Sequence, residues 1–231
     1  MRLDIVYEDD YMIACVKPYG MSSQPDKTNN ADLLTEVTQY LYDRSDSDEE
    51  PYVAIINRLD RPVSGIVLFA KDMDTAAKLT DMLKDGEITK YYQAVVWGLM
   101  KEPEGILEDY ILHDKKKNVS KIVPKGTKGA KPAKLGYEVL DELDTDEGTI
   151  SYLLVELMTG RHHQIRCQMA ANKTPIWVDR KYGRPAGGKA NKEIGLYSTR
   201  IEFTHPITGE EIVLHREPEG KAFDIMDQMD W

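Results

Sequence analysis

Short runs of apolar, β-branched and aromatic residues, bounded by turn residues, recur along the chain and predict β-strands. They cover residues 11–16, 52–56, 65–70, 91–96, 150–157 and 198–203. Apolar residues at helical spacing predict helices over 31–42, 74–85 and 163–171. Because strands dominate and do not alternate strictly with helices, the pattern predicts an α+β fold: a large, mainly antiparallel mixed sheet with a few peripheral helices.

The 231 residues show no internal repeat, low-complexity tract or Gly/Ser linker, and we therefore predict a single domain over 1–231. The apolar stretches are far shorter than the roughly 20 residues that cross a bilayer, and the N-terminus lacks a signal-peptide pattern. We expect a cytoplasmic protein with no membrane segment. Cys15 and Cys167 are not at ligand spacing, which favours small buried thiols over a zinc site.

Charge is unevenly distributed. The formal net charge is −10, which by itself argues against a nucleic-acid partner. One segment nevertheless carries eight lysines and no acid: Lys115, Lys116, Lys117, Lys121, Lys125, Lys128, Lys131 and Lys134. Acids cluster over 43–50, 141–147 and the tail 217–231. The lysine run indicates either a solvated loop or a surface that contacts phosphate.

A first candidate site lies between two predicted strands, over residues 57–65. Asp60 is flanked there by Arg58 and Arg61, while Pro62 stiffens the turn and Gly65 permits an unusual backbone angle. A carboxylate between two strands is held on rigid supports, as a preorganised site requires. A solvated hairpin whose charges cancel fits the same pattern, and periodicity does not choose between the two.

A second candidate site lies over residues 158–166, where a predicted strand leads into a short helix. Arg161 and Arg166, with His163 and Gln164 between them, place several donors near a helix start, where anions are favoured. The adjacent His162 and His163 are not at metal spacing. Surface ion pairs and buried, satisfied histidines are the structural alternatives.

Together these two segments resemble the RluA family of pseudouridine synthases, whose signatures are H-R-L-D-x-x-T-S-G and T-G-R-x-H-Q-[ILV]-R. Further matches are the front segments 7–10 and 17–20, K-x-Y-x-A at 90–94, the stretch 174–183, and the later segments 203–206 and 208–210. The resemblance spans about residues 4–215, leaving the acidic tail 217–231 outside. It begins so early that we expect the small N-terminal RNA-binding domain of many members to be missing.

The chain departs from the family pattern at three places. Asn57 stands where His is usual, Val63 where Thr is usual, and Trp177-Val178 where a glycine commonly precedes the aspartate. We expect an active enzyme because the carboxylate, its arginine partner and the tyrosine are all present.

The resemblance implies a rearrangement in RNA. The bond from N1 of uracil to C1′ of the ribose breaks, the base turns, and C5 rejoins C1′. No redox step or net hydrolysis occurs, so we expect no cofactor and no metal. The resemblance makes Asp60 the catalytic carboxylate, as a nucleophile or as a base taking a sugar proton. It assigns Arg166 as the cation that keeps Asp60 ionised and Tyr92 as the active-site tyrosine.

The remaining assignments concern substrate binding. A flipped base is commonly stacked on an aromatic face, and Arg58 is placed to fill the space it leaves. Arg61, Arg161, His163, Gln164 and Ile165 complete the expected substrate contacts. The lysine run, with Lys115, Lys116 and Lys117 at its start, is expected to form an RNA-binding rim. The expected partner is ribosomal or transfer RNA rather than DNA, bound by a monomer.

Two rival functions stay open on sequence grounds. The first is a noncatalytic RNA-binding or ribosome-assembly factor that keeps the fold. The second is a carbohydrate-acting enzyme that uses Asp60, but its required second carboxylate has no candidate at a matching motif.

Overall fold

The computed structural model describes residues 2–27, 30–183 and 193–227, which contain eleven strands and four helices. Every strand pair with a resolved register is antiparallel, and the predicted α+β class is confirmed. The chain forms two compact units, one of residues 1–89 and 198–217 and the other of 90–197 and 218–231. The prediction of one domain stays a prediction.

The first unit holds the strands at the start and near the end of the chain. They are β1 (Ile5–Glu8), β2 (Met12–Lys17), β3 (Ala54–Ile55), β4 (Ser64–Ala70), most of β10 (Leu196–Thr204) and β11 (Glu211–His215). Their order is β1-β2-β4-β10, with β3 paired to β4 and β11 to β10. Gly65 has φ +116°, and a Cβ there would lie 2.3 Å from the carbonyl oxygen of Ser198. The close approach of β4 to β10 therefore requires glycine at this position.

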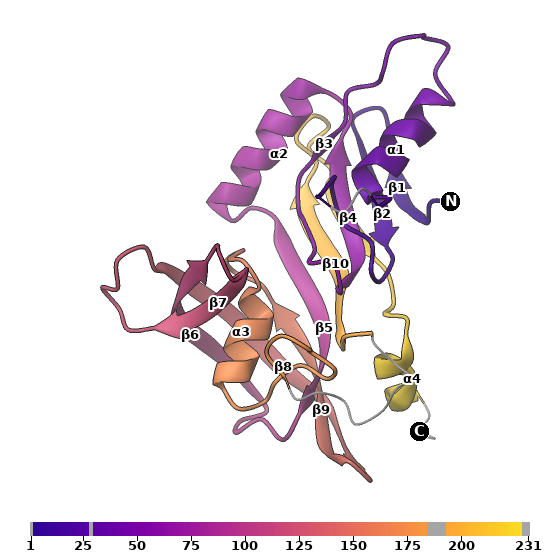
Figure 1. Cartoon of the computed structure of the whole chain (residues 1–231). Coiled ribbons are helices and arrows are strands. Elements are labelled where there is room, and N and C mark those ends of the chain that lie inside the picture. Colours follow the sequence, from indigo (N-terminus) through magenta and orange to yellow (C-terminus); the bar gives the residue numbers. More distant parts are fainter. Residues whose placement is uncertain (1, 28–29, 184–192, 228–231) are drawn as a thin grey trace. The chain divides into compact units, whose positions relative to one another are not determined.

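Two helices belong to this unit. α1 (Leu33–Tyr42) and α2 (Met73–Asp85) are both capped at the N-terminus by an aspartate, Asp32 and Asp72. Gly86 ends α2 in the left-handed conformation. α2 packs on β3 and β4 over an apolar core (Figure 1). That core includes Met12, Ile66, Leu68, Leu79, Ile201 and Phe203.

The second unit is built on the strand order β5-β9-β8-β6-β7. These are β5 (Thr89–Trp97), β6 (Glu104–Asp114), β7 (Val119–Val123), β8 (Lys131–Thr145) and β9 (Gly148–Glu156). α3 (Gln164–Ala171) lies against β6 and β7, and α4 (Lys221–Asp227) follows at the end of the chain (Figure 1). Residues 228–231 of the predicted acidic tail lie outside the described residues.

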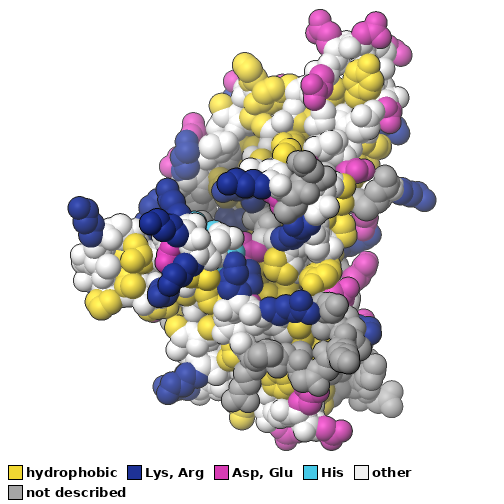
Figure 2. All heavy atoms as spheres, in the orientation of Figure 1, with side chains coloured by type: hydrophobic (Ala, Val, Ile, Leu, Met, Phe, Trp, Pro, Cys, Tyr) yellow, Lys and Arg dark blue, Asp and Glu magenta, His cyan; other side chains and the backbone are white. Residues whose placement is uncertain are grey.

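The lysine-rich stretch is not one solvated loop. It begins in the β6–β7 turn, continues through β7 and a second turn, and ends in the first residues of β8. Figure 2 shows lysine and arginine side chains gathered over the β6–β7 hairpin. Lys115, Lys116 and Lys117 are all exposed in its turn, and Asp114 accepts hydrogen bonds from the backbone N–H groups of the last two. The hairpin therefore presents lysines on an ordered support.

Both cysteines are free and buried, as predicted from the sequence. Burial raises the pKa of Cys15 to about 12 and that of Cys167 to about 11. Each thiol is therefore protonated at neutral pH and packs as a small apolar side chain.

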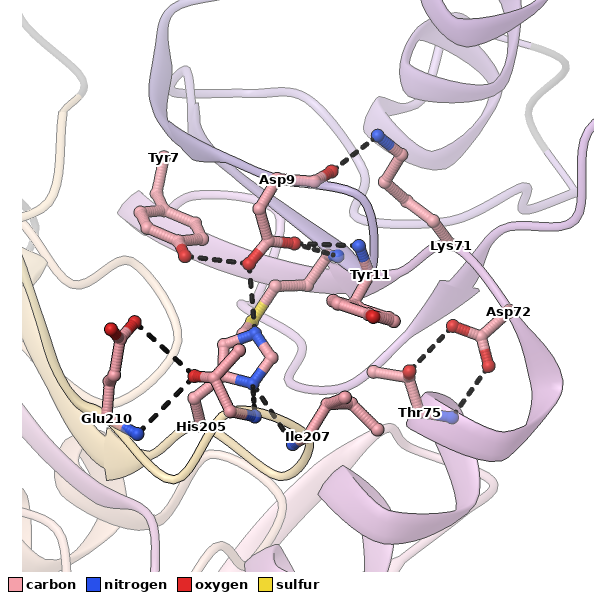
Figure 3. Close-up of polar contacts among 11 residues, drawn as sticks. Tyr7, Asp9, Tyr11, Lys71, Asp72, Thr75, His205, Ile207 and Glu210 are labelled. Atoms are coloured by element: carbon pink, nitrogen blue, oxygen red, sulfur yellow. Dashed lines mark hydrogen bonds and ion pairs between the residues drawn. The ribbon is translucent and has the colours of Figure 1, made fainter.

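A polar cluster around Asp9 joins β1, β2 and the β10–β11 turn of the first unit (Figure 3). The Asp9 carboxylate accepts hydrogen bonds from the Tyr7 hydroxyl and from the backbone N–H groups of Tyr11 and Met12, all at 2.7 Å. His205 Nδ1 accepts from two backbone N–H groups, so Nε2 carries the proton and donates to Asp9 at 2.9 Å. Burial raises the pKa of Asp9, but the hydrogen bonds together lower it by more.

This cluster makes His205 a stabilising residue. We predict that His205→Ala lowers the free energy of unfolding by about 2–4 kcal/mol, because it removes a buried side chain with its hydrogen bond to Asp9 and leaves two backbone N–H donors without their acceptor. Denaturant unfolding at neutral pH measures this. The exposed His215 is the matched control, and His215→Ala should change stability by no more than about 0.5 kcal/mol. Equal effects at the two positions would contradict the stabilising role.

Candidate functional site

The loop that carries Asp60, residues 57–65, is fastened to β4 at its start. The Asn57 side chain is buried, donates to the carbonyl of Ile66 at 3.2 Å and accepts from the N–H of Leu68 at 2.8 Å. The N–H of Val63 donates to the carbonyl of Asp60 at 2.9 Å and closes a turn. The two departures from the family motif in this loop therefore contribute to its order: Asn57 anchors it, and the Val63 side chain is buried.

Residues 17–24, which we call the Lys17 loop, hold both neighbours of Asp60. Ser23 Oγ donates to the carbonyl of Leu59 at 2.9 Å and accepts from its N–H at 3.0 Å. The N–H of Gly20 donates to the carbonyl of Arg61 at 3.0 Å, and Arg61 Nε donates back to the carbonyl of Gly20 at 2.8 Å. The half-buried Asp60 thus sits between two residues whose main chains are tied to one loop.

The two arginines beside Asp60 differ in their contacts. The Arg61 side chain binds the Lys17 loop through Gly20 and lies 3.7 Å from the Asp26 carboxylate. Arg58 is exposed and donates a long hydrogen bond, 3.5 Å, to the Gln24 side chain. Arg58 can therefore move toward a substrate at lower cost than Arg61.

Arg166, in the second unit, forms a buried bidentate ion pair with Asp179. Its Nε and Nη2 donate to the two carboxylate oxygens at 2.7 and 2.8 Å, and both side chains are almost fully buried. Burial raises the pKa of Asp179, but the hydrogen bonds and positive charge of Arg166, with two backbone N–H groups, lower it overall. The pair fixes the guanidinium plane, which leaves Arg166 little freedom to reorient.

Asp179 lies in the stretch 174–183, which matches the family pattern. The preceding Val178 has φ +57°, a left-handed conformation that is costly for a β-branched residue. The glycine that commonly stands before this aspartate in the family pattern would adopt that angle freely. A strained residue directly before a buried carboxylate is typical of functional segments.

The start of α3 is organised by Gln164. Its Oε1 accepts from the Thr159 hydroxyl at 2.8 Å and from the N–H of Arg161 at 3.0 Å, while its Nε2 donates to the carbonyl of Lys134 at 3.1 Å. Arg161 Nε in turn donates to the carbonyl of Pro132 at 2.8 Å. Gln164 therefore shapes the 159–161 turn against β8, and its predicted substrate contact stays a prediction.

His163 begins α3 from a left-handed conformation, φ +52°. Its Nδ1 lies 2.8 Å from the Tyr182 hydroxyl, which also accepts from the N–H of Ser120 at 2.7 Å. Tyr182 lies under the Arg166 guanidinium, 5.3 Å from ring centroid to Cζ. Hydrogen bonds and ring contacts thus connect α3, the 176–182 segment and β7 within this unit.

Three imidazole rings stack beside this network. His113 and His162, and then His162 and His163, have ring centroids 3.7 Å apart. Stacked rings point their nitrogens outward rather than at one ion. Within the described part of the chain, no three His, Cys, Asp or Glu side chains are grouped as metal ligands would be. These histidines pack at the turn end of the β6–β7 hairpin, where His162 also contacts Asn118 and Ser120.

Tyr92 and Ile165 are both buried in the second unit. Tyr92 lies on β5 opposite Val155 of β9, and Ile165 lies in the first turn of α3. The predicted pairing of Arg166 with Asp60, like the grouping of Tyr92 with Asp60, joins residues of different units and stays a prediction.

Known proteins share the fold and the sequence pattern of this chain. The fold is that of pseudouridine synthase domains: the solved human RNA pseudouridylate synthase domain containing 1 matches with a TM-score of 0.75 at 20% identity, covering 94% of this chain and 84% of that one. A family model described as RNA pseudouridylate synthase matches residues 11–171. The chain therefore belongs to the RNA pseudouridylate synthase family and is an isomerase that converts uridine in RNA to pseudouridine.

Two curated relatives cover most of the chain. The tRNA pseudouridine synthase C of Vibrio parahaemolyticus is 29% identical over 100% of this chain and 96% of its own length. The ribosomal large subunit pseudouridine synthase D of Neisseria meningitidis is 33% identical over 92% of this chain and 57% of its own length. The resemblance drawn from the sequence is confirmed. Among the described residues, no helix is long and apolar enough to span a membrane.

The buried ion pair gives a direct test. We predict that Asp179→Ala lowers the free energy of unfolding by about 3–5 kcal/mol, because it leaves the Arg166 cation buried without its carboxylate. Denaturant unfolding measures the loss, with Asp144→Ala, at an exposed position of β8, as the control. A double variant, Asp179→Leu with Arg166→Met, should recover most of the stability. If Asp179→Ala is as stable as its control, the pair is not the anchor of this segment.

Proposed function

We propose that this enzyme isomerises specific uridines of transfer or ribosomal RNA with Asp60 as its catalytic carboxylate. The main support for the proposal is that both chain neighbours of Asp60, Leu59 and Arg61, are hydrogen-bonded to the Lys17 loop. A carboxylate that acts at a sugar carbon must be positioned to within a fraction of an ångström, and these hydrogen bonds restrict the position of the Asp60 main chain. The relatives named for transfer and ribosomal RNA support both substrate classes.

The chemistry assigned to Asp60 has two open forms. As a nucleophile it attacks C1′ and displaces N1 of uracil; as a base it removes a sugar proton and the N1–C1′ bond breaks by elimination. In both forms the uracil turns and C5 bonds to C1′: in the first, C5 displaces the Asp60 carboxylate from C1′, and in the second, the proton that Asp60 removed returns to the sugar. The proton on C5 then leaves, and N1, whose bond to C1′ has broken, gains one. In neither form does the net oxidation state of the nucleotide change.

Four second-unit residues complete the proposed site. Arg166 supplies the positive charge that keeps Asp60 ionised, and Asp179 holds its guanidinium in a fixed plane. Tyr92 stacks on the extruded uracil, and Ile165 forms one wall of its pocket. The exposed Arg58 fills the space that the base leaves in the RNA.

The partner and setting follow from the same proposal. The lysines of the β6–β7 hairpin contact the RNA backbone, with Arg61, Arg161, His163 and Gln164 closer to the reacting nucleotide. The enzyme acts on RNA rather than DNA, as a monomer. The free thiols Cys15 and Cys167 suit the reducing cytoplasm.

The first test removes the carboxylate. We predict that Asp60→Asn and Asp60→Ala reduce isomerisation by at least roughly a thousandfold while RNA affinity stays within about threefold, because Asp60 serves a chemical step. Release of tritium from RNA labelled at C5 of uridine measures turnover. Asp74→Ala, an exposed acid of α2, is the control. Near-normal turnover by Asp60→Ala would end the assignment.

An experiment in cells tests the rival function of an inactive RNA-binding or assembly factor. Pseudouridine mapping across stable RNAs should show one or a few sites that vanish on deletion and return with the wild-type gene but not with Asp60→Ala. Sites unaffected by deletion would favour the noncatalytic factor. The RNA that carries the vanished site distinguishes transfer from ribosomal RNA as the substrate.

The second test concerns the lysine hairpin. Charge reversal of Lys115, Lys116 and Lys117 should weaken RNA binding and flatten the slope of log affinity against log salt by about two to three, because each phosphate that a lysine neutralises contributes roughly 0.7–0.9 to that slope. Binding titrations at several salt concentrations measure the slope. The paired helix lysines Lys78 and Lys84, reversed together, are the control. An unchanged slope in the hairpin variant would place the RNA-binding surface elsewhere.

A further inference from the structure

His162 occupies the open position x of the T-G-R-x-H-Q motif, and the proposed chemistry gives it no role. Its side chain is half-buried beside the turn of the β6–β7 hairpin. The ring Nε2 lies 2.9 Å from Oδ1 of Asn118, and Nδ1 lies 2.9 Å from Oγ of Ser120. Both ring nitrogens therefore meet polar groups of the hairpin.

The main chain of His162 is bound to the same hairpin. Ser120 is buried on β7, and its hydroxyl donates to the carbonyl of His162 at 2.6 Å. Because a hydroxyl has one proton, Ser120 Oγ then accepts from Nδ1 in the second contact. Ser120 thus binds both the side chain and the main chain of His162, which restricts the orientation of the ring.

The His162 ring also lies between two other imidazoles. Its centroid is 3.7 Å from that of His113 on β6 and 3.7 Å from that of His163, the N-cap of α3. His163 Nδ1 contacts the Tyr182 hydroxyl, which accepts from the N–H of Ser120 at 2.7 Å. Ring contacts and hydrogen bonds therefore connect both strands of the hairpin to the start of α3.

The turn at the end of this hairpin presents the lysines. It spans residues 115–118 and consists of three exposed lysines followed by Asn118. Asn118 has φ +51°, a left-handed conformation that asparagine adopts more readily than most residues. Lys181 Nζ donates to its carbonyl at 2.8 Å. His162 therefore contacts the residue that follows the three lysines and sets the geometry of their turn.

β7 requires support from outside the hairpin. It has five residues and stands at the end of the strand order, next to β6. A two-stranded hairpin by itself is only marginally stable in water. α3 packs against β7, and His162 adds contacts at the end of the strand nearest the lysines.

We propose that His162 is a positioning residue for RNA binding: it fixes the turn of the lysine-rich hairpin to the start of α3 and holds the three lysines in the arrangement that meets the RNA backbone. This inference rests on the proposed contact of these lysines with RNA. His162 contacts no reacting atom and acts through Asn118 and Ser120. A turn that is ordered before RNA arrives loses less conformational entropy on binding.

The first variant removes the ring. His162→Ala should weaken RNA binding by about tenfold, because the released turn must be ordered again on binding. The slope of log affinity against log salt should flatten by about one, the contribution of one lysine that no longer contacts its phosphate. The single-turnover rate with saturating enzyme should stay within about twofold of wild type, because the chemical step is unchanged. His215→Ala, at an exposed position of the first unit, is the control.

Two further variants separate positioning from a general loss of packing. His162→Gln keeps an amide group near the place of Nε2 and should bind RNA more tightly than His162→Ala. Asn118→Gly removes the partner side chain while the backbone still adopts the left-handed conformation freely. It should weaken binding by itself, but the double variant should bind within about twofold of His162→Ala, because both changes break the same contact.

Hydrogen exchange follows the turn in the absence of RNA. Peptides covering residues 110–123 should lose protection in His162→Ala, whereas peptides of β4 and α2 should not change. Denaturant unfolding of the same variant reports whether it remains folded. If it does not fold, Asn118→Gly, at an exposed position, decides by the same binding and exchange measurements.

Charge reversal of the three turn lysines, residues 115–117, separates this inference from the proposed function. Reversal should weaken RNA binding less in His162→Ala than in the wild type, because the lysines of a displaced turn contribute less. If reversal has no effect in the wild type, the proposed RNA contact of the turn fails, and this inference fails with it. If reversal weakens binding but His162→Ala binds RNA within about twofold of wild type, only the inference about His162 is overturned. Unchanged exchange over 110–123 would overturn it as well.

Discussion

The attachment of residues 59 and 61 to the Lys17 loop is the constraint on which the first unit's part of the site depends. An aspartate in an unsupported turn samples many orientations, and each costs conformational entropy when it is brought to a reacting carbon. Here Ser23 and Gly20 fix the main chain on both sides of Asp60, and Asn57 fastens the start of the same loop to β4. The rigidity of the loop comes from three contacts that do not involve Asp60 itself: those of the Ser23 hydroxyl, the Gly20 main chain and the Asn57 side chain.

In the second unit, an ion pair holds a charged side chain, Arg166, in one orientation. A bidentate carboxylate holds Arg166, and Tyr182 and His163 connect this pair to the start of α3 and to β7. Breaking a buried pair costs more than the pair contributes to stability, so such pairs secure geometry better than they add stability. Asp179 thus holds another charged group, the Arg166 guanidinium, in a fixed orientation.

The sequence predicted the elements whose apolar patterns are strong. The strand over 65–70 and the helix over 74–85 match β4 and α2 closely, because a continuous apolar run and a capped, periodic segment are local signals. β6, β7 and β8 were missed as strands. In β8, exposed Glu138, Glu142 and Asp144 alternate with partly buried residues, and pairing with β6 and β9, which a local pattern does not contain, decides the structure.

The residues of the candidate site also fall into those that the sequence predicted and those that only the structure shows. Motif resemblance supplied Asp60, Arg166 and Tyr92, since it encodes which residues occur together. Local physics could not supply Asp179 as the partner of Arg166, because a local pattern does not show that these two side chains are buried against each other. One signal for Asp179 was present in the sequence. Val178 stands directly before it, where the family pattern commonly has glycine, and Val178 adopts the left-handed conformation that glycine adopts freely.

A crystal structure of the enzyme bound to its RNA would test whether Asp60 is the carboxylate that acts at the sugar carbon. We expect an extruded nucleotide whose C1′ lies within about 4 Å of an Asp60 carboxylate oxygen, with the Arg166 guanidinium against the same carboxylate. A nucleotide seated with C1′ beside a different carboxylate, or Asp60 turned away from the RNA, would contradict it.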